Sequence, residues 1–270
     1  LGNSMCYYLT SSTNDKSDQG YENKIIGAGL NTSFEQYNDV FASLGISATR
    51  DDLTTEESAT SSLKKQSGTF NEISALYGFS FDKRNRTFMP TDGAIISFNQ
   101  SLPIYADKSF ISNSLSASSY KTLTKDVIGA TKFTISSITG LGSDDVRISK
   151  RASLSSKRLR GFEKGKVGPL DGTDHVGGNY AAALNFEALL PNFLPEDTKT
   201  DVGLFLDFGN VWGVDYDSTI NESNKIRSST GAVINWNSPL GPMNFTLATN
   251  ISKADTDVTE SFNFNLGTNF

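Results

Sequence analysis

Alternation of apolar and polar residues is the feature that most constrains the fold of this chain. It recurs in segments of about 9–13 residues that are separated by turn-forming residues. The last segment places Phe262, Phe264, Leu266, Thr268 and Phe270 on one face, and all of these except Thr268 are apolar. Because successive side chains of a strand point to opposite faces, this pattern predicts strands with one apolar face and one polar face.

The length of these segments separates two classes of β protein. Strands of a soluble β-sandwich average about 5–6 residues, whereas a tilted strand needs about 9–11 residues to cross a bilayer. The polar face is rich in Asn, Ser, Gly and Thr, which suits a water-filled lumen. About twelve segments of this kind predict an all-β fold, a transmembrane antiparallel up-and-down β-barrel. The polar stretches 11–22 and 51–67 are expected to be loops, and no helix is expected.

Composition weighs against several classes of function. The net charge of −6 and the pI of about 4.9 weakly disfavour a nucleic-acid partner. The chain has one Cys and one His, which leaves little material for a zinc site or for Cys/His catalysis. It also contains no G-x-S-x-G motif. We therefore expect no catalytic residues, no metal site and no cofactor, and an outer-membrane enzyme such as a phospholipase is disfavoured.

The predicted connections alternate between long and short, and the longest covers about residues 140–176. Outer-membrane barrels carry long loops on the extracellular side and short turns on the periplasmic side. By this parity the C-terminus is periplasmic, and the longest loop starts from the extracellular side. A loop of this length is long enough to fold back into the lumen.

Arg160, Gly161 and Phe162 lie in the middle of this longest loop. The next two strands carry Glu187 and Asp207 at positions expected to face inward. An arginine in a lumen can pair with a carboxylate through two hydrogen bonds, and Gly161 would allow a tight backbone path. From the residues alone, this pairing and an ordinary solvated loop arginine are equally good interpretations.

A resemblance to a known family favours the pairing. Arg160-Gly161-Phe162 resembles the (V)RGF/Y motif of the BamA superfamily, with Leu159 where Val is usual. Leu206-Asp207-Phe208-Gly209 resembles the superfamily's aromatic-x-Asp-x-Gly strand motif. The similarity covers about residues 70–270, and before that only the strand pattern supports it. The terminal strand, with Phe262, Phe264, Leu266 and Phe270, is similar to the C-terminal recognition signal of bacterial outer-membrane barrels.

In that superfamily the barrel has sixteen strands, and the loop with the arginine joins the eleventh to the twelfth. Five predicted strands follow Arg160 here and about seven precede it. The resemblance therefore implies that residues 1–270 are the C-terminal part of a barrel, without its first strands and without the preceding POTRA domains. It also implies that Arg160, Gly161, Phe162, Glu187, Asp207 and Gly209 form the functional motif.

The implied function is the folding and insertion of outer-membrane proteins through a lateral seam, in the outer membrane of a Gram-negative bacterium. The implied partners are outer-membrane lipids, unfolded outer-membrane protein clients and lipoproteins of an assembly complex, without nucleic acid. Two alternatives stay open: a two-partner-secretion or TamA-like translocator of the same superfamily, and a passive porin-like pore. A count of POTRA domains in the upstream sequence would separate the superfamily members.

Overall fold

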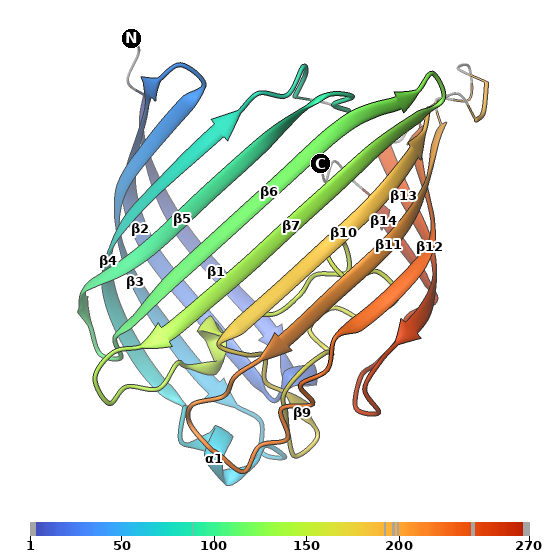
Figure 1. Cartoon of the computed structure of the whole chain (residues 1–270). Helices are drawn as coiled ribbons and strands as arrows, with labels where there is room; N and C mark the ends of the chain where they lie inside the picture. The colour runs from blue at the N-terminus through green and yellow to red at the C-terminus, as the bar shows by residue number, and fades with distance from the viewer. Residues whose placement is uncertain are drawn as a thin grey trace.

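The computed structural model describes residues 4–87, 89–191, 193–195, 198, 200–238 and 241–266. Its main element is a twelve-stranded antiparallel sheet that curls around a central space (Figure 1). The result confirms the predicted all-β fold and the number of strands. The strands of this sheet are β1 (Ser4–Lys16), β2 (Tyr21–Tyr37), β3 (Val40–Thr55), β4 (Gly68–Asp82), β5 (Gly93–Ala106), β6 (Phe110–Thr124), β7 (Val127–Gly140), β10 (Tyr180–Leu190), β11 (Thr200–Trp212), β12 (Arg227–Ser238), β13 (Gly241–Ser252) and β14 (Phe262–Leu266).

Each strand of the sheet pairs with the next one along the chain, which is the predicted up-and-down topology. The pairing of β7 with β10 continues this order, because the intervening β8 (Leu170–Asp171) and β9 (Asp174–His175) form a separate two-stranded hairpin in the connection. The sheet runs from β1 at one edge to β14 at the other, and no pairing between these two strands occurs in the described part of the chain.

The two faces of the sheet follow the alternation of the sequence. Large apolar side chains point outward and stay exposed, among them Phe186, Leu204 and Leu247. On β14, Phe262, Phe264 and Leu266 are 54%, 47% and 60% exposed. Exposed apolar groups of this kind are expected on a surface that faces lipid rather than water. The predicted signal residue Phe270 lies outside the described residues.

The predicted loops 11–22 and 51–67 are too long, because the neighbouring strands extend into both of them. Strand β1 continues to Lys16, β2 begins at Tyr21, and β3 continues to Thr55. Backbone hydrogen bonds between strands do not require apolar side chains. Here polar side chains also form hydrogen bonds between neighbouring strands. Asn23 donates to Asp51 at 2.8 Å, for example, and Asp51 is 1% exposed. Within 51–67 there is also a single helical turn, α1 (Ser61–Lys64), where no helix was expected.

The three longest connections lie at one end of the sheet, shown at the bottom of Figure 1. They comprise residues 56–67, 141–179 and 213–226, and the connection 253–261 lies at the same end. The opposite end includes the two-residue turns 38–39 and 125–126. Among the described residues, no helix is both long enough and apolar enough to cross a membrane.

Candidate functional site

The connection between β7 and β10, residues 141–179, folds inward and is called the inward loop below. Figure 1 shows its yellow-green trace inside the curl of the sheet. It packs by means of its own apolar side chains, which meet apolar side chains on the inner face of the wall. The cluster that forms between the loop and the wall contains Phe110, Ile138, Val146, Ala152, Leu154, Leu159, Phe162, Val167, Ala181, Ala183 and Val211.

Arg160 lies at the inner tip of the inward loop and is 7% exposed. Its Nε and Nη2 atoms donate to the two carboxylate oxygens of Asp207 at 2.7 and 2.6 Å. Its backbone N–H also donates to Asp207, at 3.1 Å. Asp207 lies on the inner face of β11 and is fully buried. Two parallel charge-assisted bonds in a buried setting fix the direction of the arginine as well as its position.

Glu187 on β10 accepts from the same arginine. Nη1 of Arg160 lies 2.9 Å from one carboxylate oxygen of Glu187, and Nζ of Lys132 lies 2.7 Å from the other. Lys132 comes from β7, so the inner faces of three consecutive strands take part. Two cations and two carboxylates balance in charge, which offsets the cost of removing them from water.

Several contacts around Arg160 and Asp207 were not predicted from the sequence. The guanidinium carbon lies 3.9 Å from the ring centroid of Phe205, a cation–π contact. Asn185 donates to Asp207 at 2.8 Å and to the backbone carbonyl of Arg158 at 2.9 Å. Phe205 and Asn185 each precede a predicted carboxylate by two positions. The alternation of the strands therefore places both side chains on the inner face, but it does not predict their contacts.

Two glycines allow the loop tip to approach the wall. Gly161 has a φ of 86°, and a Cβ placed there would lie 3.1 Å from the Cβ of Ala248. Its carbonyl accepts from the side chain of Asn250 at 2.8 Å and from the backbone of Glu260 at 3.1 Å. At Gly209 on β11, an added Cβ would lie 2.9 Å from the side chain of Leu154 in the loop. Gly161 therefore adopts a backbone conformation that other residues rarely take, and a side chain at position 209 would require Leu154 to move.

The first part of the inward loop is held by a second set of polar contacts with the wall. Arg147 pairs with Glu72 of β4 at 3.3 Å and lies over the ring of Phe70 at 4.4 Å. Ser149 donates to Asp51 of β3 at 2.7 Å. The loop thus bridges the space inside the sheet: its first part is bound to β3 and β4, and its tip is bound to β10 and β11.

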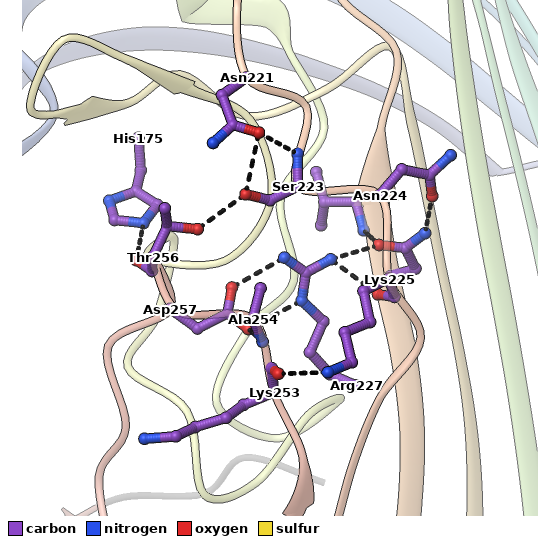
Figure 2. A network of polar contacts seen from close by, with 12 residues as sticks. His175, Asn221, Ser223, Asn224, Lys225, Arg227, Lys253, Ala254, Thr256 and Asp257 are labelled. Carbon is purple, nitrogen blue, oxygen red and sulfur yellow. Dashed lines mark hydrogen bonds and ion pairs between the residues drawn. The ribbon is translucent and has the colours of Figure 1, made fainter.

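His175, the one histidine of the chain, is 5% exposed in β9. Its Nε2 atom lies 2.9 Å from the backbone oxygen of Thr256 (Figure 2). Burial lowers the pKa of His175 below its ordinary value, and the nearby cations Lys166 and Arg227 act in the same direction. The Thr256 carbonyl and the Asp257 carboxylate oppose this shift without reversing it.

A pH dependence of stability follows from this depressed pKa. Well above the ordinary histidine pKa of about 6.5, the ring is neutral in both the folded and the unfolded state. As the pH falls below that value the unfolded chain takes up the proton first, so the folded state loses about 1.4 kcal/mol for each unit of pKa depression. His175→Gln keeps an N–H donor and removes the titration. Urea unfolding at pH 5 and 7.5 should show a smaller pH effect in His175→Gln, and an equal effect would contradict this role.

Solved structures with the same fold include the crystal structure of BamA from Haemophilus ducreyi lacking POTRA domains 1–3. The TM-score is 0.84 at 22% identity, over 97% of this chain and 58% of that one. CdiB from Escherichia coli is less similar, with a TM-score of 0.57 at 16% identity over 97% of this chain and 48% of that one.

Curated relatives are similar in sequence. One is outer membrane protein assembly factor BamA of Neorickettsia risticii, 25% identical over 94% of this chain and 35% of the relative. The assembly factor BamA of Neisseria meningitidis is 32% identical over 42% of this chain and 17% of the relative. Human sorting and assembly machinery component 50 homolog is 28% identical over 58% of this chain and 35% of the relative. The chain thus spans about a third or less of the length of these relatives.

The family assignment rests on nearly the whole chain, because residues 3–270 match the Omp85 superfamily domain. The match confirms the resemblance drawn from the Arg160 and Asp207 motifs, and it agrees with the barrel topology and with the predicted outer-membrane location. This chain belongs to the Omp85 superfamily.

Proposed function

We propose that this chain is the C-terminal barrel portion of a factor that folds and inserts other β-barrel proteins into the outer membrane. The observation that carries the proposal is the buried Arg160–Asp207–Glu187 arrangement, which holds the inward loop against β10 and β11. The relatives in which the matching segment occurs are named outer membrane protein assembly factors. The proposed role is non-enzymatic.

The chemistry of such a role is backbone pairing. Unpaired N–H and C=O groups of a strand are costly in a hydrocarbon environment, and a strand edge is a template for another strand. A client strand would pair with a sheet edge at a seam next to β14 and then pass into the bilayer. Its partners would be outer-membrane lipids, unfolded client proteins and lipoproteins of an assembly complex.

Arg160, Gly161, Phe162, Glu187, Asp207 and Gly209 would serve this role by keeping the loop inside the barrel. Every hydrogen-bonding atom of the Arg160 guanidinium faces a carboxylate of the wall. Because the charge of Arg160 is paired with two carboxylates, the arrangement is suited to stabilise β10 and β11 while a seam elsewhere in the barrel opens.

The test uses the full-length protein in lipid vesicles. A urea-unfolded outer-membrane protein is added, and its folding is followed by the gel shift of the folded form. Vesicles with the full-length protein should fold the client faster than vesicles with an unrelated closed barrel. Equal rates would contradict the proposal. Leakage of a trapped dye without faster folding would instead indicate a porin-like pore.

A further inference from the structure

A fully buried ion pair lies near the inward loop, apart from the Arg160 motif. Arg227 begins β12, and Asp257 lies in the connection 253–261 that leads to β14. Both side chains are 0% exposed. Nε and Nη2 of Arg227 donate to the two carboxylate oxygens of Asp257 at 2.9 and 2.8 Å (Figure 2).

The remaining nitrogen of the guanidinium also has partners. Nη1 of Arg227 donates to the side chain of Asn210 on β11 at 2.6 Å and to the backbone carbonyl of Lys225 at 2.8 Å. On the other side, Asp257 accepts from the backbone N–H of Ala254 at 2.6 Å, which closes the turn that carries it. A buried pair with its hydrogen bonds satisfied is stable, but losing one partner leaves a costly unpaired charge.

The segment held by this pair also bonds to the tip of the inward loop through its backbone. Glu163 donates to the carbonyl of Val258 at 3.0 Å, and Val258 donates to the carbonyl of Lys166 at 3.2 Å. Glu260 donates to the carbonyl of Gly161 at 3.1 Å. Residues 258–260 therefore lie beside 161–166 like a short added strand, one residue from Arg160.

These contacts join the loop tip to the start of the last strand. The connection ends at Ser261, and β14 begins at Phe262, where the chain joins the ladder with β13. The connection 253–261 is therefore held in place before β14 by three groups: Asn210 of β11, Arg227 of β12 and the backbone of the loop tip. The contacts come from side chains and backbone groups that are far apart in sequence.

We propose that Arg227 and Asp257 are positioning residues that couple β14, the strand at the seam, to the inward loop. The inference rests on the proposed insertion function and names two residues outside the Arg160 motif. When the pair is intact, the connection 253–261 stays bonded to the loop tip. When the pair is removed, the connection 253–261 opens locally, and β14 separates from β13 more often.

The test compares two double variants of the full-length protein in lipid vesicles. Arg227→Met with Asp257→Leu removes both charges at once, so that no buried charge is left unpaired and the barrel can still fold. Arg50→Met with Asp52→Leu is the matched control, because that pair lies 3.2 Å apart on an exposed part of β3. Backbone hydrogen exchange is measured, together with the rate at which the vesicles fold a client.

The Arg227 and Asp257 double variant should exchange at least about tenfold faster over residues 258–266, with residues 180–190 unchanged, and its client-folding rate should differ from that of the wild type. The control should match the wild type in both. Unchanged exchange at 258–266 would overturn the proposal, as would an equal increase throughout the barrel. Faster exchange with a wild-type folding rate would overturn the coupling to insertion. A wild type that folds no client would instead refute the proposed function, whatever the exchange shows.

Discussion

Asp207→Arg should prevent most of the protein from reaching its folded form with the loop inside the barrel. The substitution places a second buried cation against Arg160, where Asp207 now accepts three hydrogen bonds from that residue. Removing one partner of a buried ion pair costs about 3–5 kcal/mol, and reversing its charge costs more. A domain is typically stable by only about 5–15 kcal/mol, so the folded fraction should fall steeply.

The fraction of folded barrel in membranes measures this effect, read from the gel shift between unheated and heated samples. Asp201→Arg is a matched control on the same face of β11, because Asp201 is only partly buried and makes no ion pair with the described residues. The control should fold like the wild type. If Asp207→Arg folded and inserted clients as well as the control, the arrangement around Arg160 would have no role in either process.

Phe162→Ala is expected to have the second largest effect. Phe162 is 1% exposed and belongs to the apolar cluster that fills the space between the loop and the wall. Emptying such a site costs about 3–5 kcal/mol. Because this loss falls on the loop rather than on the strand ladder, the loop tip should detach before the sheet unfolds.

Trypsin cleavage after Arg160 reports on this detachment. In the wild type Arg160 is 7% exposed, and in Phe162→Ala the bond after it should be cut at least about tenfold faster. Phe186→Ala is the control, since that ring is 42% exposed on the outer face. Equal cleavage of Phe162→Ala and Phe186→Ala would show that the ring does not hold the loop.

The strands could be predicted because their alternation is a local property of the sequence. The partners of Arg160 could be named because Glu187 and Asp207 stand at inward positions of the next two strands. Lys132 could not be named in the same way. Its contact with Glu187 depends on the register between β7 and β10, which is set across the whole inward loop and not by residues near either strand.

The Arg227–Asp257 pair escaped prediction for a related reason. Charged residues in polar connections are usually solvated, and nothing in the local sequence distinguishes Asp257 from the nearby Asp255. Burial at this point arises from packing between the inward loop and the connection 253–261. The ends of β1 and β3 were missed because backbone pairing extends beyond the apolar part of each strand.

A double-mutant cycle on Arg160 and Asp207 tests most directly whether this pair holds the inward loop in place. The full-length protein, Arg160→Ala, Asp207→Ala and the double variant are unfolded in urea, and the four free energies are compared. Arg160→Ala leaves the buried Asp207 without its cation, and Asp207→Ala leaves Arg160 with Glu187 alone. The double variant removes both charges, so we predict a coupling energy of about 2–3 kcal/mol. Single effects that add to within about 0.5 kcal/mol would contradict it.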